Sequence, residues 1–415
     1  MYYKMKKTDI CIVGAGPAGV FAALFLSKFG IESTLVDKAK FPRDKICGDG
    51  ISGWVLTILN ELDKSLLEKL SKQSFINYSY GIRIVAPNYN RLDLPFFDSG
   101  DWDPSIPPGF TARRIDFDNF MIEEVRNRKE IKLLENSEIT GYERYDNKIR
   151  LSVKSGEDIE SKIVIFANGA TSKFMKEPGG ILKTKKYVMS GVKTYYKGVT
   201  GFHKDNYVEL HFLKNVLPGY FWIFPLAGGL ANVGVGLDRY RISKRKLNLK
   251  NVMFDAIENV PYLKERFKNA QQITKVETWP LPLWDGKRSI SGDNFMLAGD
   301  AANLIDPVTG EGMGHAAISG MFAAYQAKRS LEANDFSAEA MKKYDEDVYR
   351  KIGKELDISS RIPRFIKHPW LFNAVVNRTT NSNILKEKLA LAMTDLEVRK
   401  ELKRPMLYLK VIMGR

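Results

Sequence analysis

Cysteine and histidine are scarce in this chain of 415 residues, which contains two cysteines and four histidines. Two cysteines cannot form a disulfide framework or a cysteine-rich zinc module, and they indicate a reducing compartment. The histidines are scattered, and no H-E-x-x-H segment is present, so the sequence argues against a metal hydrolase and predicts no metal site. These absences favour a cytoplasmic protein whose chemistry does not depend on a bound metal.

Long hydrophobic runs are also missing. The run at residues 10–26 is shorter than a comfortable membrane span and contains a glycine-rich stretch at 14–19. Lysines precede it, as in a signal peptide, but Asp9 interrupts its start and no small-x-small cleavage site follows. We therefore expect a cytoplasmic protein that binds at most peripherally to the inner face of a membrane.

Acidic residues are outnumbered, with 49 Asp and Glu against 64 Lys and Arg and a net charge of +15. Residues 361–415 contain 12 Lys and Arg and 4 Asp and Glu, a net charge of +8, next to apolar groups at 369–372 and 406–409. This pattern suits either a helical tail with a solvated basic face or a surface that lies on anionic lipid. No nucleic-acid recognition motif accompanies the charge, so we expect no nucleic-acid partner.

The N-terminal segment has the pattern of a dinucleotide-binding unit. A buried strand at 8–13 is followed by Gly14-Ala15-Gly16-Pro17-Ala18-Gly19, a helix at 20–29, and a strand at 32–36 that ends at Asp37 and Lys38. Gly14 permits the tight turn, Gly16 lets backbone N–H groups approach a pyrophosphate, and Gly19 lets helix and strand pack closely. Asp37 would accept hydrogen bonds from a ribose. Strand, helix and acid together predict dinucleotide binding.

The nucleotide fold is interrupted. Two further apolar strands, at 163–167 and 295–298, are separated by a glycine-punctuated, β-rich insert at about 176–290. Segments 114–128, 244–269 and 314–331 read as helices, and 336–415 reads as mainly helical with breaks at prolines. With 44% hydrophobic residues, the chain is long enough for two or three sub-domains.

Four motifs in order resemble the flavoprotein superfamily that includes para-hydroxybenzoate hydroxylase. They are the glycine motif with Asp37, an R-x-x-F-D segment at 114–118, an A-D-G-x-x-S-like segment at 167–172 with Asn168 for the usual Asp, and G-D-A-A at 299–302 followed by a proline and a glycine-rich turn. The resemblance implies FAD as the cofactor, bound by these motifs and their neighbours. Besides residues 14–19, Asp37 and Lys38, the cofactor-binding residues it implies are Cys47, Gly48, Arg114, Ile139, Gly169, Gly299, Asp300, Pro307, Gly310, Gly312 and Met313.

The chemistry of the last motif also indicates, apart from the resemblance, how it would bind a flavin. Asp300 follows a buried strand, where a carboxylate can hold ribityl hydroxyls. Residues 312–314 open a helix and can offer N–H groups to the flavin edge that becomes anionic on reduction.

Residues 218–225, P-G-Y-F-W-I-F-P, resemble a segment of the geranylgeranyl reductase family, as do the segments at 207–212 and 231–236. Cys47-Gly48 matches a C-G-G-type loop of that family, although Asp49 replaces one glycine. The resemblance covers about residues 8–335. It implies an α/β (α+β overall) fold with a Rossmann-like FAD-binding domain (1–80, 113–175 and 290–335) and an inserted antiparallel β-sheet substrate domain (81–112 and 176–289). The residue pattern adds a C-terminal helical region (336–415).

Substrate-binding candidates follow from the same segment. Tyr220, Trp222 and Phe224 alternate along a strand and so share one face, which would either form an aromatic wall for a long apolar chain or pack on its own core. His211 is a further candidate from the neighbouring segment. Cys47 is a candidate for substrate positioning or proton supply, or else a small residue in a turn.

The favoured function is an FAD-dependent reductase acting on carbon–carbon double bonds of an isoprenoid or other lipid by hydride transfer. A flavin-dependent monooxygenase (hydroxylase), a halogenase with a W-x-W-x-I-P segment in the same frame, and a flavin-binding scaffold without chemistry are the alternatives. No second strand-linked G-x-G-x-x-G marks a nicotinamide site. The electron donor therefore stays open among NAD(P)H, ferredoxin and a quinol.

Overall fold

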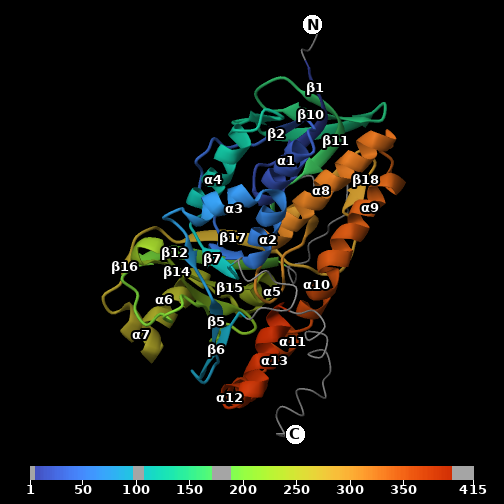
Figure 1. Ribbon diagram of the computed structural model, residues 1–415. Coiled ribbons are helices and arrows are strands. Elements are labelled where there is room, and N and C mark those ends of the chain that lie inside the picture. The colour runs from blue at the N-terminus through green and yellow to red at the C-terminus, as the bar shows by residue number, and fades with distance from the viewer. Residues whose placement is uncertain (1–4, 97–106, 171–187, 395–415) are drawn as a thin grey trace.

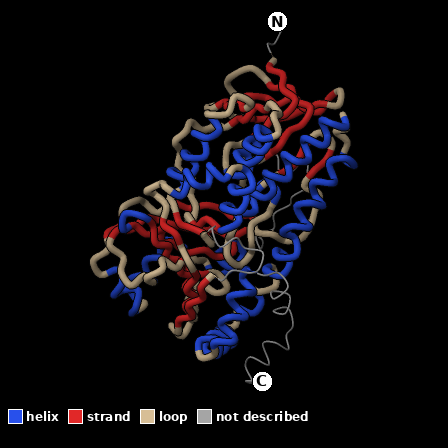
Figure 2. The backbone as a smooth tube through the Cα atoms, viewed as in Figure 1, coloured by secondary structure: helices blue, strands red, loops and turns tan. Residues whose placement is uncertain are grey.

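The computed structural model describes residues 5–96, 107–170 and 188–394, and it contains two large β-sheets with helices around them (Figure 1). The predicted residues Thr171 and Ser172, the part of the insert at 176–187 and the apolar group at 406–409 lie outside the described residues. Figure 2 shows the two strand-rich regions at different levels of the molecule, with helices between and beside them.

The first sheet contains the dinucleotide-binding strands. Its main path runs β18-β19-β11-β1-β2-β8, and the pairings of β1 with β11 and β2, of β11 with β19 and of β2 with β8 are parallel. Residues 10–13 of β1 are buried, which explains the continuous apolar run. The strands are β1 (Lys6–Val13), β2 (Ser33–Val36), β8 (Ile131–Leu134), β9 (Ile139–Tyr145), β10 (Lys148–Val153), β11 (Ile159–Phe166), β18 (Ser291–Gly292) and β19 (Phe295–Leu297).

Helices α1 and α8 contact each other beside this sheet, and small residues allow their close approach. A Cβ atom added at Gly320 of α8 would lie 2.2 Å from the Ala18 carbonyl oxygen of α1, so only glycine fits there. The helices associated with this part of the chain are α1 (Pro17–Lys28), α2 (Gly53–Leu62), α3 (Lys64–Ser71), α4 (Arg114–Arg126), α8 (Met313–Ala333) and α9 (Ala338–Val348).

The second sheet holds the predicted β-rich insert together with two earlier strands. Its path is β16-β12-β15-β14-β13-β5-β6, with β17 paired to β12, and its pairings are antiparallel apart from β13 with β5. The strands are β5 (Gly81–Val85), β6 (Arg91–Pro95), β12 (Val188–Lys197), β13 (Val208–His211), β14 (Tyr220–Leu226), β15 (Leu230–Asp238), β16 (Gln271–Gln272) and β17 (Glu277–Pro282).

Smaller elements complete the described part. A three-stranded sheet, β3 (Gly50–Ser52), β7 (Gly109–Thr111) and β4 (Asn77–Tyr78), follows the Cys47 loop. Of the C-terminal helices, α12 and α13 contact β6 at the edge of the second sheet. The remaining helices are α5 (Arg239–Arg245), α6 (Leu249–Asn259), α7 (Pro261–Phe267), α10 (Lys354–Ser359), α11 (Pro363–Ile366), α12 (Pro369–Thr380) and α13 (Asn383–Thr394).

The predicted fold class is confirmed: a mixed α/β chain with a parallel Rossmann-like sheet, an antiparallel sheet and C-terminal helices. Details differ from the sequence reading. The single helix predicted at 244–269 is replaced by the end of α5 and two further short helices, α6 and α7. The helices α2 and α3 were not predicted. Among the described residues, no helix is both long and apolar enough to span a bilayer.

Candidate active site

A cavity of about 1940 Å³ lies where the two sheets meet, and both contribute to its walls. At one end it is lined by the glycine-rich turn after β1 and by residues that follow β2 and β11. At the other end it is lined by aliphatic side chains of β5, β6 and β13 and by α12 and α13. One continuous space therefore joins the predicted nucleotide site to an apolar compartment.

The glycine motif has the geometry expected of a pyrophosphate-binding turn. Gly14 has φ +104°, and a Cβ there would lie 2.6 Å from the Ala167 carbonyl oxygen, so another residue would be strained and obstructed. A Cβ on Gly19 would lie 1.9 Å from the Gly14 carbonyl oxygen, which makes Gly19 a packing residue. A Cβ on Gly16 would meet nothing within 4 Å, and Gly16 opens onto the cavity with Pro17 and Ala18.

Asp37 connects the end of β2 to this turn. One carboxylate oxygen accepts a 2.8 Å hydrogen bond from the Ala15 N–H and the other accepts one of 2.8 Å from Ala39 N–H. Each carboxylate oxygen keeps a further lone pair for a ligand hydroxyl. The cavity is lined by Asp37, Lys38, Ile139 and Gly169. Ala15 and Gly19 belong to the same turn but are not among the lining residues.

The predicted third motif forms the opposite wall. Gly299, with φ +62°, turns the chain after β19, and Asp300 lines the cavity together with Gly310, Gly312 and Met313. Pro307 is not among the lining residues. Asp306, by contrast, is buried, and one of its carboxylate oxygens accepts hydrogen bonds from Val308 N–H, Thr309 N–H and the Thr309 hydroxyl. Both carboxylates line the cavity, but Asp306 already holds the donors of its own turn, whereas no hydrogen bond from a described residue to the Asp300 carboxylate is found.

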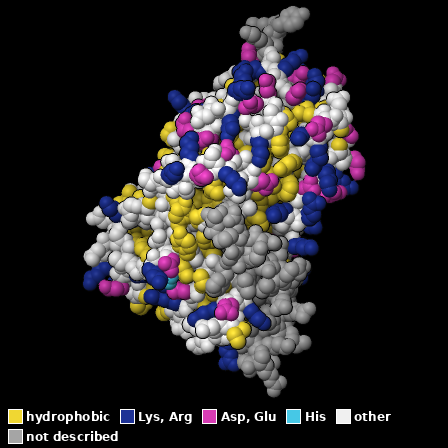
Figure 3. Space-filling view, in the orientation of Figure 1, with side chains coloured by type: hydrophobic (Ala, Val, Ile, Leu, Met, Phe, Trp, Pro, Cys, Tyr) yellow, Lys and Arg dark blue, Asp and Glu magenta, His cyan; other side chains and the backbone are white. Residues whose placement is uncertain are grey.

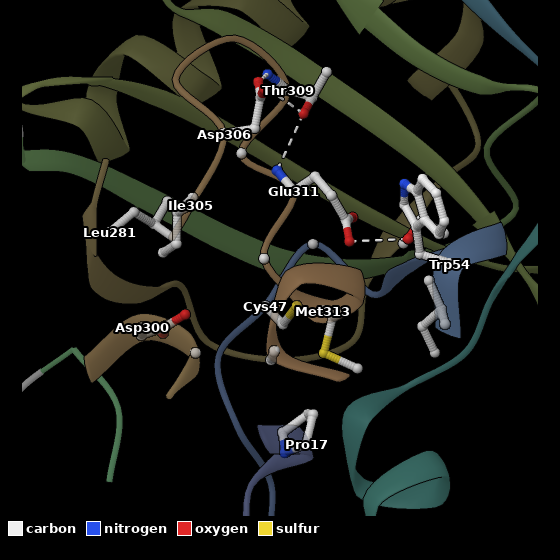
Figure 4. A pocket seen from close by; sticks show the side chains of 18 of the residues that line it. Pro17, Cys47, Trp54, Leu281, Asp300, Ile305, Asp306, Thr309, Glu311 and Met313 are labelled. Carbon is white, nitrogen blue, oxygen red and sulfur yellow. Dashed lines mark hydrogen bonds between the residues drawn. The ribbon is translucent and has the colours of Figure 1, made fainter. Parts of the chain in front are cut away.

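Glu311 is the carboxyl group that sequence reasoning left unassigned. One of its oxygens accepts hydrogen bonds from the Ser52 hydroxyl, at 2.9 Å, and from the Gly314 N–H, at 2.5 Å. Figure 4 shows its carboxyl group turned toward the side of Trp54, away from Asp300. Burial raises the pKa of Glu311, although His315 and these hydrogen bonds act in the opposite direction. Burial thus works against ionisation of Glu311, and one N–H at the start of α8 is already used.

The residues present fit FAD. Gly16 leaves open space at the backbone of the glycine turn, and the buried Asn168 side-chain oxygen has no hydrogen-bond partner among the described residues although it faces the cavity. Both features suit a ligand that occupies this end. The turn at 14–19, Asp37 and Asp300 would hold the cofactor, and the start of α8 would face its flavin.

The R-x-x-F-D segment supports the loop that carries Cys47. Arg114 makes two hydrogen bonds of 2.7 Å to Asp118, and Arg43 adds a third of 2.7 Å to the same carboxylate. Burial lowers the pKa of Arg114, but Asp118 outweighs it and raises the pKa overall, so the guanidinium stays charged. Cys47, Gly48 and Arg114 all line the cavity.

The aromatic residues of β14 form a cavity wall. Tyr220, Trp222 and Phe224 all line the space, and Tyr220 donates a 2.6 Å hydrogen bond to the Thr309 carbonyl of the α8 loop. A Cβ on Gly50 would lie 3.2 Å from the Phe224 ring, so that glycine-rich loop packs directly on the wall. The three aromatic side chains therefore connect the Cys47 loop, the α8 loop and the second sheet.

The structure places His211 away from the cavity, contrary to the sequence expectation. Its ring is fully buried between Glu209, at 3.1 Å, and the Tyr262 hydroxyl, at 3.0 Å, and it stacks on the Tyr262 ring. Arg266 also pairs with Glu209. Leu210 and Phe212 line the cavity, and strand alternation sends His211 to the other face of the sheet. Its role is structural.

Comparison with known proteins decides the family. Residues 7–327 match the model of the FAD binding domain. A digeranylgeranylglycerophospholipid reductase of Thermoplasma acidophilum is 31% identical, with 85% of each chain covered. The chain belongs to the geranylgeranyl reductase family of FAD-dependent oxidoreductases. A menaquinone reductase of Mycobacterium tuberculosis is 28% identical over 76% of this chain and 75% of its own length.

A solved structure agrees with this family assignment. A geranylgeranyl bacteriochlorophyll reductase-like protein from Thermoplasma acidophilum superimposes with a TM-score of 0.81 at 27% identity, covering 96% of this chain and 99% of that one. FAD as cofactor and a reductase of geranylgeranyl-reductase type are thereby established. Glu311 and Lys193 are among the lining residues to which the sequence analysis gave no role.

Proposed function

We propose that this reductase hydrogenates carbon–carbon double bonds in the chain of an isoprenoid or another long-chain lipid. The observation that carries the proposal is the cavity itself. It runs without interruption from the glycine turn to a wall of Trp222, Leu210 and Ile84, where polar groups are few. Such a space suits an extended apolar chain better than a compact polar substrate.

When bound, reduced FAD supplies the hydride that such a reduction needs. The protein must then hold the double bond in place and keep water away, because an unactivated alkene is a poor acceptor. Trp222 is fixed for this task, since its indole N–H donates a 2.8 Å hydrogen bond to the buried Asn232 side chain. A rigid aromatic face limits where an alkene can lie.

The second carbon of the double bond needs a proton. Cys47 faces the cavity and is a candidate for supplying it or for positioning the chain. Glu311 is a second candidate, because its buried carboxyl group has a raised pKa and lines the same space. Either residue would return to its starting state by taking a proton from water that reaches the cavity.

Lipid substrates also require contact with a membrane. Trp370 on α12 and Ile384 on α13 are 68% and 67% exposed, and both helices contribute other side chains to the apolar end of the cavity. Exposed basic residues surround them. In Figure 3, basic and hydrophobic side chains lie together at the lower end of the molecule, where Figure 1 places α12. This end is proposed to rest on anionic lipid.

An anaerobic turnover experiment tests the proposed reaction. Holoprotein reduced with dithionite is incubated without oxygen with a C20 all-trans prenyl alcohol, and mass spectrometry follows the gain of two hydrogen atoms per reduced bond. Reduction without oxygen supports the proposal. Product that forms only with oxygen would instead support the monooxygenase or halogenase alternative. NADH, NADPH, reduced ferredoxin and a quinol, each replacing dithionite, would identify the electron donor.

A further inference from the structure

One part of the cavity has no role in the function proposed so far. It is an arm between α2, α8 and the segment that joins α9 to α10, which contains the short π-helix Tyr349–Gly353. Lys351 extends from this segment toward α2, where its ammonium lies 4.7 Å from the centre of the Trp54 ring. The lining residues of the arm include Ser52, Trp54, Thr57, Lys351, Glu355 and Ser359.

The outer end of this arm is open to water. Arg350 and Lys351 line the cavity although both are exposed, so the arm reaches the molecular surface beside them. Thr57, Ser359 and Glu355, which carry hydroxyl and carboxyl groups, line the cavity as well. Water occupies a cavity where several polar groups can bind it. The arm therefore suits water, whereas the compartment beside β5 and β6 suits an apolar chain.

Glu311 lies at the inner end of the arm. Its Oε1 atom accepts the hydrogen bonds from the Ser52 hydroxyl and the Gly314 N–H, and no described residue donates to Oε2, which is left to carry a proton. A Cβ on Gly314 would lie 2.7 Å from the Trp54 Cβ and 2.9 Å from Oε1 of Glu311. The carboxyl group is thus packed against the start of α2, and Figure 4 shows it turned toward Trp54 and away from Asp300.

The loop that carries Glu311 also borders the aromatic wall. The Thr309 carbonyl accepts the hydrogen bond from the Tyr220 hydroxyl, and a Cβ on Gly310 would lie 3.1 Å from that hydroxyl oxygen. Glu311 is the next residue in the chain. It therefore lies between the wall over which an apolar chain is proposed to pass and the arm that water can enter.

Two other titratable groups lie close to Glu311. Asp306 is 3% exposed and holds three donors of its own turn, so its carboxyl group is engaged within the loop. His315 is buried outside the cavity lining, with Nδ1 2.6 Å from the Leu304 carbonyl oxygen. Burial and Asp306 raise the pKa of Glu311, whereas His315 and the two hydrogen bonds lower it. A carboxyl group whose pKa is raised by burial is suited to donate a proton near neutral pH.

We propose that Glu311 donates the proton that completes reduction of the double bond, and that water in the arm between α2 and α8 restores this proton. The O–H bond of Glu311 breaks as a C–H bond forms at one carbon, while the other carbon takes the hydride that reduced FAD supplies. FAD is left oxidised, and the Glu311 carboxylate takes a proton from water that enters beside Lys351. This inference rests on the proposed function and leaves Cys47 to position the chain.

Single-turnover measurements test the role of Glu311. Holoprotein reduced with one equivalent of dithionite is mixed without oxygen with the C20 all-trans prenyl alcohol, flavin absorbance gives the rate, and mass spectrometry identifies the product. Glu311→Gln should slow the reaction about 10²- to 10⁴-fold, the usual contribution of a general acid, with FAD content and Tm unchanged. Glu311→Asp should keep part of the rate. Glu332→Gln, the same change at an exposed position of α8, should react as wild type does.

A wild-type rate in Glu311→Gln would overturn the assignment. So would a slow Glu311→Gln variant that has lost FAD, because the carboxyl group would then serve to hold the loop. If wild type itself reduces no double bond, the proposed function fails, and this inference fails with it.

Ser52→Ala tests the assignment without removing the acid. The Ser52 hydroxyl stabilises the ionised carboxylate, so its loss should raise the pKa of Glu311 further. Only the protonated acid can donate, and the rate should therefore fall as the pH rises through this pKa. In Ser52→Ala that fall should occur at higher pH than in wild type. A lower Tm with an unmoved pH profile would make Ser52 a structural residue and would contradict the role of Glu311.

Thr57→Phe tests the arm, because a larger side chain there would narrow the path for water. Its single-turnover rate should match wild type, since Glu311 begins the reaction with its proton in place. Its rate of repeated turnover with excess dithionite should fall severalfold, since each further turnover needs a new proton. Asn60→Phe adds the same ring to α2 outside the cavity lining and should keep both rates. Equal repeated turnover by Thr57→Phe and wild type would overturn the arm as the route for protons.

Discussion

The Tyr195 hydroxyl donates a 2.7 Å hydrogen bond to the Asp49 carboxylate, across a separation of 146 residues. The same carboxylate oxygen accepts a 2.8 Å hydrogen bond from Asn232, which also donates to the Cys47 carbonyl and accepts from the Trp222 indole. Asp49 thus connects the Cys47 loop to the aromatic wall. Its φ of +65° is a glycine-like conformation.

Asp49→Gly should therefore leave the backbone unstrained but remove the network. Three buried donors, the Tyr195 hydroxyl, the Asn232 amide and the Arg114 backbone N–H, would lose their acceptor on Asp49, at a cost of roughly 1–3 kcal/mol each. We expect a lower Tm and a changed Trp fluorescence, because Asn232 would no longer fix the Trp222 indole. Tyr195→Phe, which removes one donor together with its bond, should destabilise the protein less. Equal stability of Asp49→Gly and wild type would show that the network contributes nothing.

The same carboxyl group should make stability depend on pH. Burial raises the pKa of Asp49 to about 6, while Lys193, Tyr195 and Asn232 act to lower it. Because the folded pKa exceeds the unfolded one, this contribution is present below about pH 4 and is lost as the pH rises through 6. About two pKa units correspond to about 3 kcal/mol. Urea unfolding of wild type and Asp49→Asn between pH 4 and 7 should show the difference, with wild type losing more stability.

Replacement by serine should have different effects at the two cysteines. Cys47→Ser is expected to change turnover or the choice of double bond without loss of folding, since Cys47 is part-exposed and borders the cavity. Cys11→Ser is the control: Cys11 is fully buried in β1, and burial raises its pKa to about 12. That variant should lower Tm by burying a hydroxyl. A Cys47→Ser enzyme that melts early yet keeps full activity per folded molecule would make Cys47 a packing residue.

Alanine variants of Asp300 and Asp306 should differ in their effects on FAD binding and on Tm. Asp300→Ala is expected to weaken FAD binding about 10- to 100-fold, because its carboxylate faces the cavity and accepts no hydrogen bond from a described residue. Asp306→Ala should weaken FAD binding less and lower Tm more, since Asp306 holds three donors of its turn. FAD released by heat and measured by fluorescence gives the occupancy, and equal occupancy of both variants would refute the assignment.

Local chemistry made the nucleotide half of the site predictable. Gly14, Gly19 and Asp37 act within one strand–turn–helix–strand unit, so their spacing determines their contacts. His211 and Lys193 show where this reasoning stops. Both are polar residues in strands of the second sheet, and only the tertiary packing of the sheet decides that the face with Lys193 lines the cavity whereas the face with His211 packs against Tyr262. Cross-strand register is set by long-range contacts that a single sequence does not display.

The proposed contact with anionic lipid would be made by the described basic residues around Trp370. Arg361, Arg364, Lys367, Arg378 and Lys388 are exposed on or beside α11, α12 and α13. Each basic side chain near an anionic surface contributes about 1 kcal/mol, and an inserted indole adds to this. Three or four residues acting together are enough for useful affinity.

Co-sedimentation with vesicles tests this surface directly. Wild type should bind phosphatidylglycerol vesicles at low salt and be released at 1 M salt, where the Debye length falls to about 3 Å, and it should bind neutral vesicles weakly. Arg364→Glu with Lys367→Glu should abolish binding, and Trp370→Ala should weaken it at both salt concentrations. Lys64→Glu with Lys72→Glu, at the first residue of α3 and directly after its last, makes the same charge change on exposed residues outside α11–α13 and should bind as wild type does. If both double variants lose binding equally, the attraction comes from total charge, and α12 has no specific role.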